Sequence, residues 1–579
     1  MRRLPRRRFL LGGSAGALVA ATGATVAFRR DSGSRATTPA PPPTPTSRPP
    51  GSPTPALPRG GTARLHAPAS FNFDTFDALK TGEPTVLEVL GRTHARLVDW
   101  LEPASAILGP ALAASWEQPD ADRLIVHLDP AARWHDREPL NGRLVEADQV
   151  RSHLRRGAEL ARAGRMPAVQ RPQDWLRIRN VTTPGDTIRI DTDGPDPFIL
   201  NTLASRFALV QAPESVGAFE DNWHQLRPES VVGSGPFRYE GHTDGRLRFA
   251  AHTMGHAAPL LDAMEVFEPS ELVARFRERQ LDEALFRDRR EAPAALAGHE
   301  SAVATLWRYE DSPIITTLSI GAAPWDNVNL RRGLSAALNR GELARRLFAG
   351  RAQACGPVSP AHTAFAHTES DLARFPGYRT DPAPDLADAR QYWEAGGGPA
   401  LGALTIDIPA VFEPLYSASS VIAPMLREAL GVEVRVRVDS YTAISERASS
   451  GAYGNGQLAF WFGWGPPDVE PDPSRALIET YDSISPTAAA FGFRSDAANL
   501  AIADIRDALE LNERKDGVKR LQSHLLDEAG GPVVTWLLQR SELLRWNYYS
   551  APPPTPFWNQ HLAPEHALDA SHASYPGRP

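Results

Sequence analysis

The fold class is decided by residues 401–439, which read LGALTIDIPAVFEPLYSASSVIAPMLREALGVEVRVRVD. Over 404–408 and again over 432–438, apolar residues alternate with polar or small ones, as they do in strands. Between these runs, apolar residues recur at helical spacing from Ile422 to Leu430. The stretch predicts a β-α-β unit, whose right-handed crossover implies a parallel sheet with a helix packed on it. Ligands of such sheets gather at the carboxyl ends of the strands.

Patterns elsewhere in the chain agree with a mixed class. An apolar stripe at helical spacing predicts a helix over 328–350, capped by Asp326 or Asn327 and broken or kinked at Gly341. Short alternating runs between Pro- and Gly-rich turns, such as 187–190, predict further strands. We expect an α/β or mixed α+β protein.

The composition excludes several classes of protein. With 579 residues, 42% of them hydrophobic and 23% charged, the chain is globular and long enough for several lobes. Its single cysteine, Cys355, has no partner for an intramolecular disulfide. Residues 1–30 contain seven Arg and no acidic residue, so the rest of the chain is more acidic than the net charge of -7 indicates. An acidic body without a long basic run argues against a nucleic-acid partner.

The N-terminus has the features of an export signal. Residues 1–30 include PRRRFLL (5–11), followed by a Gly/Ala-rich apolar stretch, and resemble a twin-arginine signal. The alternative is an uncleaved anchor, because the apolar stretch over 10–28 has 19 residues, near the minimum for a bilayer span. Residues 31–60 contain ten Pro among Thr, Ser and Ala, which predicts an extended linker. We therefore expect an exported protein, periplasmic or extracellular.

Five motifs follow one another along the body of the chain. They are PALAASWE (110–117), RWHDREPL (133–140) with EADQV (146–150), VGSGPFRY (232–239), VNLRRGLSAALNR (328–340) and FWFGWGPPDVEPDP (460–473). In this order they resemble the bacterial extracellular solute-binding proteins of family 5, the peptide- and nickel-type receptors of ABC importers. The second motif departs from the family pattern at Arg137, where glycine is usual, and at 141–145, which look inserted.

The resemblance implies a periplasmic binding protein-like type II fold. In such a fold two main lobes joined by a hinge close on a ligand, and an additional lobe is attached. After the signal segment and the linker, the resemblance implies lobe I at 61–85, 185–312 and 527–579, lobe II at 86–184, and lobe III at 313–526. Lobe I is then discontinuous in sequence.

The same resemblance implies a receptor and not an enzyme. The protein would capture an oligopeptide-like or related amine-bearing solute by lobe closure and deliver it to an ABC permease in the membrane. We expect a monomer that needs no cofactor. Two other hypotheses remain: a sensory or regulatory binding protein that is not coupled to transport, and a metal-dependent hydrolase.

Asp468 is the first candidate for contact with a ligand. In peptide-binding members of the family, an Asp shortly after the equivalent tryptophan pairs with the ligand's amino terminus, and such a charge-assisted bond is strong in a closed cleft. The alternative is an acid that caps a turn. Trp464 and Trp461 could form flat apolar walls for ligand side chains. Because strand alternation puts these two on opposite faces, we expect Trp464 at the cleft and Trp461 in the core.

Histidine clusters raise the hypothesis of a metal site. His252 and His256 have i, i+4 spacing, with His242 nearby, and His362 is close in sequence to His367. A zinc hydrolase would also need a carboxylate base, and the sequence HTMGH that begins at His252 contains no Glu. We expect a solvated loop there, no metal site and no catalytic residue.

Overall fold

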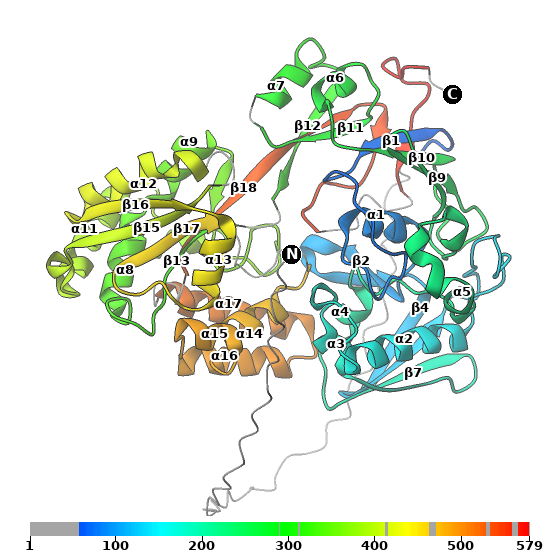
Figure 1. Cartoon of the computed structure of the whole chain (residues 1–579), viewed down its shortest axis with the longest axis horizontal. Coiled ribbons are helices and arrows are strands. Elements are labelled where there is room, and N and C mark those ends of the chain that lie inside the picture. The colour runs from blue at the N-terminus through cyan, green and yellow to red at the C-terminus, as the bar shows by residue number, and fades with distance from the viewer. Residues whose placement is uncertain are drawn as a thin grey trace, which may run out of the picture. The chain divides into compact units, whose positions relative to one another are not determined.

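Strand β18 (Val533–Trp546) connects two parts of the main sheet (Figure 1). Its first half pairs with β13 (Ile314–Thr317) and β14 (Ala352–Ala354). Its second half pairs with β11 (Glu283–Phe286) and β12 (Val303–Tyr309). Lobes I and III are therefore joined through β18 and through the short connection from β12 to β13, which contains the expected lobe boundary.

The computed structural model describes residues 57–288, 290–310, 313–410, 415–462, 470–527, 533–557 and 565–577. These residues all belong to one compact unit, residues 47–579. No helix within those ranges has both the length and the hydrophobicity that crossing a bilayer requires. The predicted signal segment and most of the predicted linker lie outside the described residues.

Lobe III contains the predicted β-α-β unit. β15 (Ala403–Pro409) and β16 (Glu433–Asp439) pair in parallel and are connected by α12 (Leu415–Leu430), which confirms the prediction. β17 (Gln457–Phe462) lies parallel to β15 on its other side. Ile406 of β15 is buried in a core shared with α12. The carboxyl ends of the three strands thus lie at one edge of the sheet, where ligands of parallel sheets gather.

The long helix predicted after Asn327 is two helices. α8 (Val328–Ala337) begins at Asn327, whose side chain accepts a hydrogen bond from a backbone N–H of the first turn at 2.9 Å. α9 (Arg340–Phe348) begins at Asn339 in the same way, also at 2.9 Å. The break therefore precedes Gly341, because the side chain of Asn339 offers the N–H groups of a new first turn an acceptor.

Lobe I is built on a four-stranded sheet. The order of its strands is β1 (Thr62–His66), β10 (Ala263–Phe267), β9 (Arg246–Ala251) and β8 (Phe237–Thr243). β1 pairs with β10 in parallel, and the other pairs are antiparallel. Apolar residues of α1 (Pro84–Thr93) share a buried core with Trp546 at the end of β18. The strand that connects the lobes therefore also belongs to the core of lobe I.

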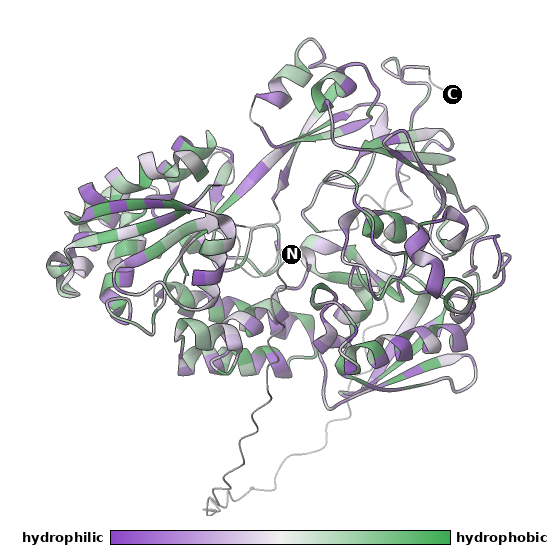
Figure 2. Ribbon diagram, viewed as in Figure 1, coloured by the Kyte–Doolittle hydropathy of each residue, from purple (hydrophilic) through white to green (hydrophobic). Residues whose placement is uncertain are grey.

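Lobe II contains a separate four-stranded sheet. The order of its strands is β4 (Ala113–Asp120), β5 (Arg123–Leu128), β7 (Thr187–Thr192) and β6 (Ile178–Thr182). β7 confirms the strand predicted over 187–190. The helix α2 (Ala147–Arg162) packs in the same lobe, and Figure 2 shows hydrophobic and hydrophilic residues alternating around it. Its apolar face includes the buried Val150 and Leu154.

Two of the expected lobe boundaries divide elements that the structure keeps together. The boundary at 184/185 separates β6 from β7, although the two strands pair in one sheet. The boundary at 85/86 assigns nearly all of α1 to lobe II, although its buried residues Val86, Val89 and Leu90 belong to the core of lobe I. In both cases contacts between segments distant in sequence decide the lobe to which an element belongs.

In the described part of lobe III after β17 there are four helices. They are α14 (Ser474–Tyr481), α15 (Pro486–Phe491), α16 (Asp496–Asp507) and α17 (Leu511–Asp527). Their common core contains Leu477, Ile502 and Leu521. It also contains Phe198, which precedes α4 (Ile199–Ala204) near lobe II. Apolar packing therefore connects these helices with a segment far away in sequence.

Candidate functional site

A cavity of about 140 Å³ lies in lobe I, next to the strands that lead to lobe III. It is surrounded by β1, α1, β11, β12, β18 and the C-terminal segment 551–557. Its polar lining consists of His66, Glu88, Arg92, Glu283, Arg308, Arg545, Thr555 and His566, and its apolar lining includes Leu65, Leu285, Leu543 and Phe557. Apolar walls with a few polar groups are typical of small-molecule sites.

Helix α1 brings a buried ion pair to the cavity. Nη1 of Arg92 lies 2.6 Å from Oε2 of Glu88, one helical turn away, and the two side chains are 1% and 3% exposed. The same guanidinium lies 5.3 Å from the ring centre of Phe249. Because an unpaired buried charge is costly, each of the two side chains depends on the other.

A second ion pair joins β18 to β11. Arg545 and Glu283 are opposite each other in the register of the two strands, and Nε of Arg545 lies 2.6 Å from Oε2 of Glu283. The same guanidinium donates from Nη1 to the carbonyl oxygen of Ala551 at 2.7 Å and from Nη2 to that of Pro552 at 3.1 Å. Arg545 therefore attaches the C-terminal segment to the sheet.

The C-terminal segment covers one side of the cavity. It reads APPPTPF over 551–557, and its three consecutive prolines line the cavity. Nε of Arg308 donates to the carbonyl oxygen of Thr555 at 2.9 Å. Because proline has no N–H, arginines that bind carbonyl groups are well suited to hold such a segment in place.

His66 lines the cavity as a neutral side chain. Its Nδ1 lies 2.8 Å from the carbonyl oxygen of Ala67, and its Nε2 accepts a hydrogen bond from the N–H of Leu285 at 2.9 Å. These partners require the proton to be on Nδ1. Burial lowers the pKa of His66 to about 4, because the charged imidazolium would lose its hydration. The histidine therefore adds no charge to the cavity at neutral pH.

The cavity is linked to lobe III through Phe557. Its ring lies 4.8 Å from the ring of His362, and Nε2 of His362 lies 2.9 Å from the carbonyl oxygen of Glu470. Glu470 immediately follows the segment that carries Trp464 and Asp468, and both of these candidates lie outside the described residues. Glu470 is thus connected to the cavity lining through two contacts, from its carbonyl oxygen to His362 and from His362 to Phe557.

Trp461 is buried in the core of lobe III. Its side chain is 0% exposed, and its Nε1 donates to Oγ1 of Thr317 at 3.1 Å. Its ring lies 5.7 Å from that of Tyr441, the first residue of α13 (Tyr441–Ser449). This position is the one that strand alternation predicts for Trp461 when Trp464 faces the cleft.

The VGSGPFRY motif packs against the end of α1. A Cβ on Gly233 would lie 1.9 Å from the carbonyl oxygen of Thr93, and one on Gly235 would lie 2.8 Å from that of Arg92. Only glycine allows this close approach of two backbones. The motif therefore positions the helix that supplies Glu88 and Arg92.

The histidine clusters are structural where the chain is described. His252 was expected in a solvated loop, but it is 3% exposed, and its ring lies 4.7 Å from that of His135. Its Nδ1 lies 3.2 Å from the carbonyl oxygen of Gly235. His367 contacts Ser523, with 3.1 Å between Nε2 and Oγ. In the described ranges, no group of three or more His, Cys, Asp or Glu residues is arranged to hold a metal ion.

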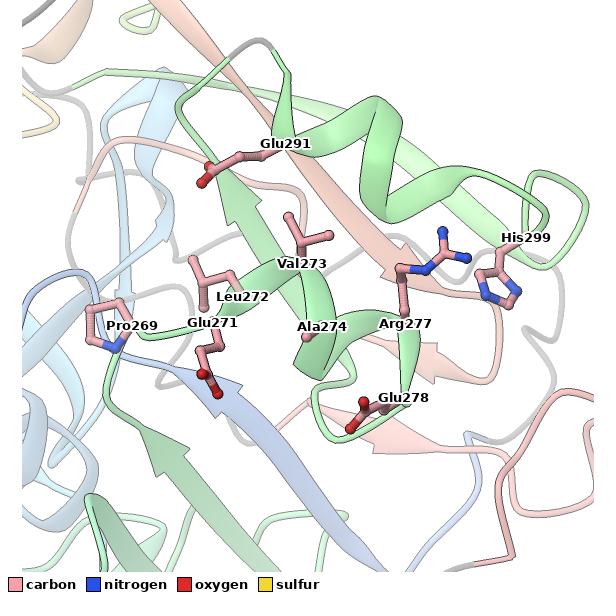
Figure 3. A pocket seen from close by; sticks show the side chains of 9 residues that line it. All are labelled: Pro269, Glu271, Leu272, Val273, Ala274, Arg277, Glu278, Glu291 and His299. Atoms are coloured by element: carbon pink, nitrogen blue, oxygen red, sulfur yellow. The ribbon is translucent and has the colours of Figure 1, made fainter.

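A second hollow lies on the surface of lobe I, between α6 (Leu272–Arg277) and α7 (Glu291–Leu296) (Figure 3). It has a volume of about 750 Å³. In the figure, the carboxylates of Glu271, Glu278 and Glu291 point in different directions. They do not converge on a common point, so the hollow offers no evident arrangement for a ligand.

The family of the protein is shown by its sequence profile. The profile of the bacterial extracellular solute-binding proteins, family 5, middle region, matches residues 108–483. The chain belongs to this family. No curated protein sequence matches it significantly. The family consists of extracellular or periplasmic binding proteins and not of enzymes.

Solved structures show the same fold at low sequence identity. HbpA2 from Haemophilus parasuis is 14% identical, with a TM-score of 0.73, and the match covers 88% of this chain and 100% of that one. DppA from Helicobacter pylori, solved with the peptide STSA, is 18% identical, with a TM-score of 0.64 and coverages of 88% and 98%. AppA from Bacillus subtilis, solved with a nonapeptide, is 13% identical, with a TM-score of 0.62 and coverages of 88% and 99%. The predicted type II periplasmic binding-protein fold is confirmed.

The cavity lining was not found by sequence reasoning, although weak signals were present. The spacing of Glu88 and Arg92 places two charges on one side of a helix whose neighbours at Val86, Val89 and Leu90 are apolar. Charged residues on an apolar helix face indicate a buried pair or a site. The partners that complete the lining come from four distant strands, and no local pattern brings them together.

Proposed function

We propose that the protein is an extracytoplasmic solute receptor of an ABC importer, which captures an oligopeptide-like or related amine-bearing solute by lobe closure. The observation that supports this most strongly is the cavity beside β18, the strand shared by lobes I and III. A ligand there would contact lobe I directly and would lie near His362 and Glu470 of lobe III, which follow Phe557 in a chain of contacts. Closure about β18 would then enclose the ligand.

In this proposal Asp468 binds the amino group of the ligand, and Trp464 provides an apolar wall. A carboxylate is the natural partner of an ammonium group, and the bond gains strength when closure excludes water. Trp461, which precedes that segment in sequence, lies in the core, where its indole N–H is bound to Thr317. No catalytic role is assigned to any of these side chains.

The proposal also includes where the receptor works and where it delivers the solute. Residues 1–30 direct export, residues 31–60 act as a spacer, and the receptor works as a monomer in the periplasm or outside the cell. It then delivers the solute to a membrane permease. Retention by an uncleaved N-terminal segment would keep the receptor near that permease.

The decisive experiment begins with native mass spectrometry of the purified protein, to identify a co-purifying solute. Calorimetric titration of that solute follows, with Asp468→Ala as the test variant and Asp504→Ala as the control, because the Asp504 side chain is 60% exposed on α16. We expect Asp468→Ala to weaken binding of an amine-bearing solute by at least about tenfold, whereas Asp504→Ala binds normally.

Two results would contradict the proposal. Unchanged affinity of Asp468→Ala would remove the amine-binding role of that residue. A protein that co-purifies with no solute, and whose unfolding is not shifted by any peptide or amine, would remove the receptor function. A solute at about 100 times its Kd should add about 2.7 kcal/mol to the free energy of unfolding.

A further inference from the structure

A cluster of charged side chains lies between lobe II and lobe III, outside the cavity lining. Arg171 immediately precedes α3 (Pro172–Leu176) in lobe II, and it binds Glu479 of α14 in lobe III with both terminal nitrogens, at 3.2 and 2.6 Å. Asp174 of α3 is bound in turn by Arg475 of α14. Lobe II thus contributes one arginine and one carboxylate. Lobe III contributes one arginine and two carboxylates, because Oε1 of Glu470 also lies 3.6 Å from Nε of Arg171.

The centre of this cluster is buried and fully bonded. The side chains of Arg475 and Asp174 are each only 10% exposed. Nη2 of Arg475 also donates to the carbonyl oxygen of Phe198 at 3.0 Å and to Oγ1 of Thr202 at 3.1 Å. Arg171 connects the two pairs, because its Nε lies 2.8 Å from Oδ2 of Asp174. The cluster is therefore a continuous network and not a set of isolated surface pairs.

Apolar and backbone contacts accompany the charges. The guanidinium of Arg475 lies 5.4 Å from the ring centre of Phe198, and that of Arg514 lies 5.7 Å from it. Phe198 is buried together with Leu477 of α14. Oγ1 of Thr363 in lobe III donates to the carbonyl oxygen of Ala104 in lobe II at 3.0 Å. The two lobes therefore form an interface of charged, apolar and backbone contacts.

No direct connection of the chain holds this interface together. The chain goes from lobe II back to lobe I through β8 to β12 before it enters lobe III, so α3 and α14 are not connected directly. Asp174 and Arg475 are 301 positions apart. Any rotation of lobe III about β18 that opens the cleft changes the distance between α3 and α14.

We propose that Arg171, Asp174, Arg475 and Glu479 form a clasp that holds lobe II to lobe III in the closed receptor and sets the fraction of ligand-free protein that is closed. The inference rests on the proposed function, because the clasp affects solute binding only if the lobes close over the solute. Because the solute is bound by closure of the lobes, a clasp that stabilises the closed protein raises the apparent affinity for the solute.

The clasp can be tested without any ligand. Spin labels on Arg155→Cys in α2 and Asn512→Cys in α17 report the distance between lobes II and III, because both positions are exposed. The native Cys355 is 2% exposed and will not compete for the label. Double electron–electron resonance is then measured on the otherwise unaltered chain, on Arg171→Glu, on Glu479→Arg and on the variant that carries both reversals.

The expected result is specific to the pairing of charges. Each single reversal places like charges together and should lower the ratio of closed to open protein by about tenfold or more. The double reversal re-forms the pair between positions 171 and 479 and should restore part of the ratio, because the reversed charge at position 171 still faces Asp174. Glu479→Gln should act in the same direction with a smaller effect. Arg520→Glu, which breaks an exposed 2.8 Å pair with Asp504 inside lobe III, should leave the ratio unchanged.

Two results would overturn the clasp. One is a distance distribution that stays the same in both single reversals. The other is a double reversal that opens the protein as much as the single ones do. Circular dichroism of each variant checks that the lobes remain folded. Failure of the clasp leaves solute binding measurable by calorimetry, and failure of solute binding leaves these distances measurable, so the two proposals are tested separately.

Discussion

Acidification should destabilise the protein through His362, the buried histidine between the cavity lining and lobe III. The side chain of His362 is 0% exposed, and burial lowers its pKa from 6.5 to about 4. In the unfolded chain the imidazole regains water and its ordinary pKa. Between pH 6.5 and 4, the unfolded state therefore binds a proton that the folded state excludes, so stability falls as the pH falls through this window.

The size of the effect follows from the two pKa values. At pH 5, a group with a pKa of 6.5 when unfolded and about 4 when folded costs about 2 kcal/mol of unfolding free energy relative to neutral pH. Other buried histidines also make the free energy of unfolding depend on pH, so the contribution of His362 must be isolated with a variant. His362→Gln removes the titrating group and keeps an N–H donor for the carbonyl oxygen of Glu470.

The assay is chemical denaturation of the parent chain and of His362→Gln at pH 7.5 and pH 5, followed by tryptophan fluorescence. The parent should lose about 2 kcal/mol more than the variant between these two pH values. His224→Gln, at an exposed position, is the matched control and should keep the parent's pH dependence. Equal losses in the parent and in His362→Gln would refute the reasoning, because the buried histidine would then not be excluding a proton.

Three further outcomes follow from particular contacts, each measured by denaturation at pH 7.5. Glu88→Ala leaves the guanidinium of Arg92 buried without its partner and should cost about 3–5 kcal/mol, most of which the double variant Glu88→Leu, Arg92→Met should restore. Gly233→Ala forces a Cβ against the carbonyl oxygen of Thr93 and should cost at least about 1–3 kcal/mol; an unchanged midpoint would contradict the close approach. Asn327→Ala removes the cap of α8 and should cost about 1 kcal/mol, with Asn327→Asp as the conservative control.

The parts of the fold that could be predicted from sequence are those fixed by local periodicity. The β-α-β unit over 401–439 follows from alternation, helical spacing and alternation again, and all three elements are present. Asn327 was one of two possible caps, and its side-chain chemistry identifies a helix start. The order of the motifs predicted the family, and the match of the family profile to residues 108–483 confirms it.

The parts that could not be predicted depend on contacts between distant segments. Nothing in the sequence near Thr187 shows that β7 pairs with β6 in the sheet of lobe II. His252 was expected in a solvated loop but is buried, with the ring of His135 packed against it. The cavity lining combines residues as far apart as His66 and Arg545, and only the assembled sheet brings them together. Asp468 and Trp464 stay predictions, because they lie outside the described residues.

The sharing of β18 by two lobes restricts how the protein can change in length. In a strand, a shift of one residue moves every side chain beyond it to the opposite face. Deletion of Gln539 would therefore turn the side chains of Leu544 and Trp546, which are buried in lobe I, to the opposite face of the strand. Leu537, which is buried in lobe III, would stay in place. Insertions and deletions that survive selection should avoid β18 and accumulate in loops, where an added residue changes no register.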